Sequence, residues 1–131
     1  SGPLLDRIDI HIEVAPLNEN ELISKGKGEK SELVLKRVMA ARELQEKRLA
    51  GTGIYYNANM NSRSIRDYCE LDQKCETLLR HSIRELQLSA RAYDRILRVA
   101  RTIADLAQSE KITADHIYEA VQYRALDKQL W

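Results

Sequence analysis

Apolar and polar residues alternate along the first segment of the chain, from Leu4 to Val14. The apolar positions of this alternation are Ile8, Ile10, Ile12 and Val14. A period of two residues is typical of a β-strand with one buried face. A lone strand leaves backbone groups unpaired on both edges, and no second strand of comparable strength follows. We therefore predict that residues 1–17 form the last strand of an α/β core that the rest of this sequence does not supply.

The remainder of the chain has a helical period. Five helices are predicted, over residues 31–50, 64–69, 72–86, 89–108 and from 113 onward. The apolar stripe of the first helix comprises Val34, Val38, Ala41, Leu44 and Leu49. Residues suited to helix N-caps are Ser31, Asp72, Ser89 and Thr113. Residues 18–30 carry two glycines and alternating lysines, which predicts a linker loop. The predicted fold is mainly α, a bundle of four to five helices preceded by one β-strand.

Composition agrees with one helical domain. The chain has 131 residues, of which 44% are hydrophobic, enough for one modest core. Phe is absent and Gly and Pro number 5 and 2, which favours helices over a sandwich or barrel. The net charge of +1 requires neither nucleic acid nor an anionic membrane as partner. No apolar run approaches the roughly 18 residues that span a bilayer, and no export signal is recognised, so we expect a cytoplasmic protein without membrane contact.

Cysteine and histidine residues do not form a metal or catalytic set. Cys69 and Cys75 have no second cysteine pair and no histidine at metal-finger spacing, so we predict reduced, structural thiols and no metal site. The histidines, His11, His81 and His116, fall in different predicted elements. No Ser/His/Asp or Cys/His arrangement follows from their spacing, and the sequence contains no complete active site of this kind.

Arg91, Arg95 and Arg98 share one face of the predicted helix over residues 89–108. At about 100° per residue they fall within about 60° of one another, opposite the apolar stripe. Arg91 lies in the first helical turn, where the positive end of the helix disfavours a cation by roughly 0.3–1 kcal/mol. An arginine beside free backbone N–H groups suits a bound anion. Arg91 is therefore a candidate phosphate contact, and Arg95 and Arg98 are weaker candidates.

The alternative interpretation of this face is a solvated, salt-bridged surface. Two pairs of opposite charge lie four residues apart, Asp94 with Arg98 and Arg101 with Asp105. Charged side chains at this spacing pair routinely on exposed helices. Position alone favours this surface role for Arg95, Arg98 and Arg101.

Arg7 lies just before the predicted strand, where its side chain would project from a sheet edge. Its local alternative is an ion pair with Asp6 or Asp9. The stretch Gly26–Ser31 invites comparison with a phosphate-binding loop, which needs a glycine directly before Lys-Ser and a buried strand before the loop. Glu29 stands in the place of that glycine, so no phosphate-binding loop is predicted here.

Several segments resemble the magnesium-chelatase-like family of AAA+ ATPases. Residues 1–9 (SGPLLDRID) resemble the end of the ATPase core of that family. Four further segments resemble the C-terminal domain of that family: residues 42–45 (RELQ), 57–60 (NANM), 88–106 (LSARAYDRILRVARTIADL) and 117–124 (IYEAVQYR). The block over residues 88–106 favours the competence-protein branch over the chelatase subunit.

The resemblance implies a ring-forming ATPase in which residues 31–131 are the C-terminal helical lid and residues 1–17 end the core. It implies that Arg7 is an arginine finger acting in trans and that Arg91 is the sensor-2 residue, which contacts an ATP phosphate. ATP and Mg²⁺ are the implied cofactors of the full-length protein. The phosphate loop and the acidic magnesium-binding box of the family would precede Ser1, so the 131 residues alone should not hydrolyse ATP.

The implied partners are neighbouring subunits of a homo-oligomeric ring, a hexamer, and DNA, which ATP hydrolysis would remodel or translocate. Two alternatives stay open from the residues themselves. The helices over residues 72–86 and 89–108 are joined by a tight turn and resemble a helix-turn-helix module that presents arginines to nucleic acid phosphates. The second alternative is a helical protein-interaction domain without nucleotide chemistry.

Overall fold

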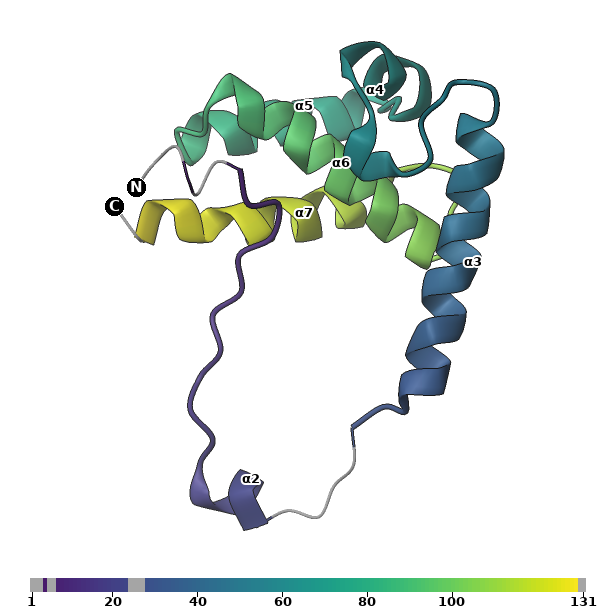
Figure 1. The fold of residues 1–131 in the computed structure, drawn as a ribbon. Helices are drawn as coiled ribbons and strands as arrows, with labels where there is room; N and C mark the ends of the chain where they lie inside the picture. The colour runs from purple at the N-terminus through teal and green to yellow at the C-terminus, as the bar shows by residue number, and fades with distance from the viewer. Residues whose placement is uncertain (1–3, 5–6, 24–27, 130–131) are drawn as a thin grey trace.

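The computed structural model describes residue 4, residues 7–23 and residues 28–129, with side chains as far as residue 124. Its elements are α2 (Glu19–Ile23), α3 (Ser31–Leu49), the 3-10 helix η1 (Asn57–Asn59), α4 (Ser62–Tyr68), α5 (Gln73–Glu85), α6 (Ala90–Leu106) and α7 (Ala114–Gln129). Helices α4 to α7 gather around one end of α3, and the rest of α3 extends away from this bundle (Figure 1). The predicted mainly α fold with a helical bundle is confirmed. None of the described helices is both long and apolar enough to cross a membrane.

The β-strand predicted near the N-terminus is wrong. Residues 7–23 and 28–129 contain no strand, and residues 10–18 have no regular secondary structure. The alternating apolar side chains are exposed, from 41% at Ile8 to 84% at Val14. A strand requires a second strand for its backbone hydrogen bonds, and the described residues provide none. The sequence therefore has the two-residue period of a strand, but the described residues contain no sheet in which its backbone groups could be paired.

Residues 18–30, predicted as a linker loop, contain the short helix α2. Asn18 Oδ1 accepts a hydrogen bond from Glu21 N at 2.8 Å, and Glu21 Oε2 accepts one from Asn18 N at 2.9 Å. This reciprocal pair is the capping-box arrangement, which satisfies two backbone donors at a helix start. No residue of α2 is buried, so α2 is local structure without tertiary packing. Residues 24–27 of the predicted loop lie outside the described residues.

The four longer helices follow the predicted ranges closely, but their caps differ in part. Asp72 caps α5 as predicted, because its Oδ1 accepts from Cys75 N at 2.8 Å. Ser31 is already helical, and the N-cap of α3 is Lys30, which makes no side-chain cap bond. Ser89 occupies the N-cap of α6 as predicted but also makes no side-chain cap bond.

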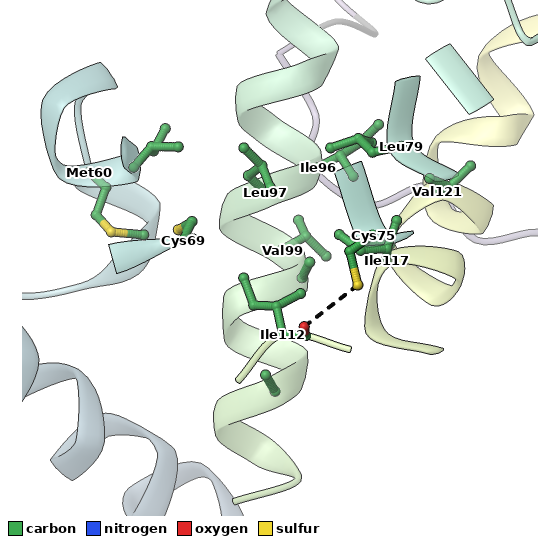
Figure 2. Packing of buried hydrophobic residues seen from close by; sticks show 14 of the residues in the cluster. Met60, Cys69, Cys75, Leu79, Ile96, Leu97, Val99, Ile112, Ile117 and Val121 are labelled. Carbon is green, nitrogen blue, oxygen red and sulfur yellow. Dashed lines mark hydrogen bonds between the residues drawn. The ribbon is translucent and has the colours of Figure 1, made fainter. Parts of the chain in front are cut away.

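The hydrophobic core forms on both sides of α6. Ile96 of α6, Leu79 of α5 and Ile117 of α7 are completely excluded from solvent. Figure 2 shows Leu79 and Ile117 on one side of α6, and Met60 and Cys69 on the other. Helix α6 therefore contacts side chains from before and after it along the chain, and it is the central helix of the bundle.

Both cysteines are buried and free, on opposite sides of α6 (Figure 2). Cys75 Sγ donates a weak hydrogen bond to the carbonyl oxygen of Ile112 at 3.7 Å. Burial raises the pKa of the Cys69 thiol to about 11, and burial together with the Asp72 carboxylate raises that of Cys75 to about 11. Since the thiolate is the reactive form, neither cysteine is a nucleophile at neutral pH. This agrees with the structural role predicted for them.

A buried carboxylate, Asp105 of α6, connects α3 and η1 to α6. The Asp105 side chain has no exposed surface. It accepts hydrogen bonds from Arg48 at 2.5 and 2.9 Å and from Asn57 Nδ2 at 2.9 Å. Arg101 Nη2 lies 3.2 Å from the same carboxylate. Gln45 Oε1 accepts from Asn57 N at 3.0 Å, which ties η1 to α3 a second time.

Arg101 is not part of a solvated face, which corrects that prediction. It is 5% exposed, and besides Asp105 it contacts the carbonyl oxygens of Ser109 at 2.8 Å and Glu110 at 3.1 Å. Burial lowers the pKa of the Arg101 guanidinium, and the adjacent Asp105 carboxylate opposes this shift. An arginine side chain is not deprotonated in proteins, so Arg101 is charged and holds the loop between α6 and α7 against α6.

We expect Leu79→Ala to lower the free energy of unfolding by about 2–5 kcal/mol, because it leaves a cavity in the core. Urea denaturation followed by circular dichroism measures this change. Leu106→Ala is the matched control, since Leu106 of α6 is 40% exposed, and we expect it to cost less than about 1 kcal/mol. Equal losses for the two variants would contradict the position of the core.

We expect Asp105→Ala to lower the free energy of unfolding by about 3–5 kcal/mol, because it leaves Arg48 and Arg101 without their shared carboxylate. The control is Glu76→Ala, which removes an exposed ion pair with Arg80 and should cost less than about 1 kcal/mol. The same denaturation experiment compares them. A loss no larger than that of Glu76→Ala would show that the buried network contributes little.

Candidate functional site

The candidate site lies along α6, where residues 7–11 lie against α6 and α7. His11 N donates to the carbonyl oxygen of Tyr123 in α7 at 3.0 Å, and Arg124 donates to the carbonyl oxygen of Ile8. Arg95 of α6 contacts the same segment through Arg7 and Asp9. Figure 1 shows this N-terminal segment, in purple, passing α7 beside the bundle. The structure thus brings the Arg7 segment to the helix that carries the other three candidate arginines.

Arg91 is exposed in the first turn of α6. Its side chain makes no hydrogen bond or ion pair within the part of the chain that the structure describes. The first turn of α6 contains no acidic residue, and the Ser89 side chain does not cap it. The first backbone N–H groups of a helix have no intrahelical acceptor. Ala92 N donates to the carbonyl oxygen of Ser89 at 3.0 Å, but no side chain caps the helix start that carries the exposed Arg91 guanidinium, an arrangement that suits a phosphate or another anion.

Arg7 is also exposed, and its side chain pairs with no residue in the described ranges. Of its two predicted local partners, Asp9 pairs with Arg95 instead, and Asp6 lies outside the described residues. The backbone of Arg7 is held at both ends. Its N–H donates to the carbonyl oxygen of Leu4 at 3.1 Å, and its carbonyl oxygen accepts from Arg95. The backbone is fixed while the guanidinium stays accessible.

Arg95 lies one helical turn after Arg91 and has a different environment. Its Nη1 donates to Asp9 Oδ1 at 2.7 Å and to the carbonyl oxygen of Arg7 at 3.2 Å. The side chain is 23% exposed. Its donors are thus directed to the N-terminal segment, whereas those of Arg91 are directed to solvent.

Arg98 connects α6 to the segment that precedes α4. Its Nη1 donates to the carbonyl oxygen of Met60 at 3.0 Å, and the residue is half-buried. The predicted ion pair between Asp94 and Arg98 is wrong, because the Arg98 guanidinium is turned to this carbonyl. The three arginines share one face of α6, as the helical period predicts, but Arg91 is the member of this trio that makes no such contact.

Sequence reasoning missed Arg124, which is 1% exposed. A signal for its burial was present. Arg124 follows Ile117 by seven positions and Val121 by three, the spacing of one helix face, and both of these residues are buried. The contact between Asp9 and Arg95 had no comparable signal, because the two residues are 86 positions apart.

A groove of about 1040 Å³ opens at the other end of α6. Its lining includes Arg101, Lys111, Glu110 and Asp115, so its charges are mixed. None of the predicted site arginines lines it. Arg7 and Arg91 are instead both exposed.

Comparison with known proteins assigns the chain to a family. Residues 28–124 match the family described as magnesium chelatase, subunit ChlI, C-terminal. The chain is 46% identical to the uncharacterized protein YifB of Escherichia coli (strain K12) and 44% identical to the competence protein ComM of Haemophilus influenzae. Each match covers 99% of this chain and 25% of the relative.

A more distant relative, an uncharacterized protein of Mycobacterium tuberculosis, is 33% identical over 95% of this chain and 24% of its own length. The chain therefore spans about a quarter of the length of these relatives. The family match covers helices α3 to α6 and most of α7, including Arg91, Arg95 and Arg98. This chain belongs to the magnesium chelatase ChlI C-terminal family, in the branch that includes ComM.

Proposed function

We propose that this chain is the helical lid of an AAA+ ATPase, in which Arg91 contacts an ATP phosphate and Arg7 acts on the nucleotide of a neighbouring subunit. The observation that carries the proposal is the Arg91 guanidinium, which is exposed and unpaired within the described residues in the first turn of α6, where no side chain caps the helix. A cation at this end of a helix lowers local stability unless an anion is bound. Membership of the chelatase family supports a nucleotide as that anion.

The chemistry requires cationic hydrogen-bond donors at fixed positions. ATP with Mg²⁺ supplies the phosphoryl group, whose transfer spreads negative charge over the γ-phosphate oxygens. The Arg91 guanidinium donates to phosphate oxygens together with the first N–H groups of α6. The Arg7 guanidinium, presented in trans, stabilises the charge that develops during transfer. Contact of Arg91 with the phosphate links the nucleotide state to the position of the lid.

The remaining parts of the active site are proposed to come from an ATPase core outside these 131 residues. The exposed apolar side chains of Ile8, Ile10, Ile12 and Val14 support this, because nothing in the described residues covers them. A G-x-x-x-x-G-K-S/T loop is not among the 131 residues. We further propose a homo-oligomeric ring, a hexamer, that remodels or translocates DNA. The name of the relative ComM, a competence protein, supports this last step.

The helix-turn-helix alternative has less support. It requires Arg91, Arg95 and Arg98 to contact nucleic acid phosphates together. Arg95 and Arg98 instead donate to groups within this chain. Of these three arginines Arg91 alone is exposed, and the net charge of the chain is only +1, so the electrostatic footprint for a duplex is weak.

In the full-length protein, we expect Arg7→Ala to leave ATP binding largely intact and to lower turnover about 1000-fold or more, because a finger acts on the transition state. Steady-state hydrolysis and fluorescent-nucleotide titration measure the two effects. Mixing with a phosphate-loop variant should restore part of the activity, since each subunit supplies what the other lacks. Arg80→Ala is the matched control, an exposed arginine on α5. Unchanged turnover in Arg7→Ala would exclude the finger.

We expect Arg91→Ala to lower kcat/KM for ATP about 10- to 100-fold, because it removes a charge-assisted hydrogen bond to phosphate. Arg91→Lys keeps the charge but not the planar donor group, so its loss should be intermediate. The hydrolysis assay is run with analytical ultracentrifugation in the presence and absence of ATP. An Arg91→Ala protein with normal hydrolysis and normal assembly would contradict a phosphate contact.

A further inference from the structure

The backbone around Arg7 is fastened to two helices of the lid by separate contacts. Arg95 of α6 binds the Arg7 carbonyl and the Asp9 carboxylate. Arg124 of α7 donates to the carbonyl oxygen of Ile8, and the carbonyl oxygen of Tyr123 accepts from His11 N at 3.0 Å. Residues 7–11 therefore form no strand but follow the surface of the lid. We call these residues the finger segment.

The Arg95 contact differs from an ordinary surface ion pair. One nitrogen, Nη1, donates both to a carboxylate at 2.7 Å and to a backbone carbonyl at 3.2 Å. The two acceptors are two residues apart in the finger segment, so the guanidinium fixes the backbone between them. The Arg95 side chain is 23% exposed, whereas that of Asp9 is 47% exposed. The interaction thus defines where the peptide of Arg7 lies relative to α6.

We infer that Arg95 and Asp9 are positioning residues for Arg7, which couple the finger segment to the helix that carries Arg91. The inference rests on the proposed function, because it concerns the placement of the proposed finger. Arg95 follows Arg91 by four residues, one turn of the same helix face. A movement of α6 when phosphate binds Arg91 therefore reaches the Arg7 carbonyl through a single side chain. The nucleotide held by one subunit sets how that subunit presents its finger to the next.

Through this coupling, phosphate binding at Arg91 also affects the position of Arg7, although the two arginines contact different nucleotides. A guanidinium that stabilises a transition state must be placed within a fraction of an ångström, and a displacement of about 1 Å can cost about 100-fold in rate. The flexible Arg7 side chain achieves this placement only if its backbone is held. Buried Arg124 holds Ile8 next to it, but Arg95 is the residue that contacts Arg7 itself.

The contact itself is tested by hydrogen–deuterium exchange on the 131-residue chain. We expect Arg95→Ala to speed exchange of the His11 amide about two- to fivefold, the opening expected when one partly exposed pair is lost. Arg80→Ala is the matched control and leaves this rate unchanged. Slow exchange at Ile96, in the core of α6, verifies that each variant is folded. An unchanged rate at His11 in Arg95→Ala would overturn the inference.

The kinetic consequence is tested in the full-length ATPase. We expect Arg95→Ala and Asp9→Ala each to lower kcat about 10- to 100-fold and to leave KM for ATP unchanged, since neither side chain contacts ATP. Exchanging the charges, Asp9→Arg with Arg95→Asp, should recover part of kcat. In an Arg7→Ala background, Arg95→Ala should cause no further loss, because the group that it positions is gone.

The other outcomes separate this inference from the proposed function. A raised KM with unchanged kcat in Arg95→Ala would assign Arg95 to the nucleotide and overturn the positioning role. Faster exchange at His11 without any change in kcat would also overturn it. Full turnover in Arg7→Ala would overturn the finger and its positioning together. The exchange experiment contains no ATP, so it would still show whether Arg95 holds the segment.

Discussion

The buried Asp105 carboxylate determines how α6 is oriented in this protein. An ionised carboxylate removed from water loses several kcal/mol of solvation, and this loss is offset only when hydrogen-bonding partners surround it. Arg48 of α3, Asn57 of η1 and Arg101 of α6 are those partners. Because they come from three elements, the carboxylate is satisfied only when these elements have their native arrangement. The direction in which α6 presents its other residues depends on that arrangement.

The two halves of α6 then have different tasks. Towards its C-terminus, Arg101 and Asp105 are buried and make internal contacts. Towards its N-terminus, Arg95 holds the finger segment, and Arg91 stays exposed. A cation in the first turn lowers helix stability, and the network at the other end is part of the structure that tolerates this cost. Arginine thus makes internal contacts near the C-terminus of α6 and is exposed in its first turn, where we propose that it contacts phosphate.

The sequence predicts local features of this fold and misses those that join distant residues. The helical period locates α3, α5, α6 and α7, and Asp72 correctly predicts a cap. Arg48 and Asp105 are 57 positions apart, so no local pattern predicts their contact. The burial of Arg101 and Asp105 nevertheless had a local signal. Both residues follow Leu97 at intervals of four, so they lie on the same buried face of α6. The strand prediction failed for the opposite reason: the period was clear, but its hydrogen-bonding partner was missing.

Helix α3 shows how a correct period can still mislead about burial. The stripe predicts that Val34, Val38, Ala41 and Leu49 all face inward. Ala41 and Leu49 are buried, but Val34 and Val38 are 40% and 37% exposed. Only the second half of α3 lies against the bundle (Figure 1), where Arg48 reaches Asp105. The first half has a stripe without a covering surface, which the proposed ATPase core would provide. With one half bound to that core and the other to Asp105, α3 would transmit rotation of the lid as a rigid body.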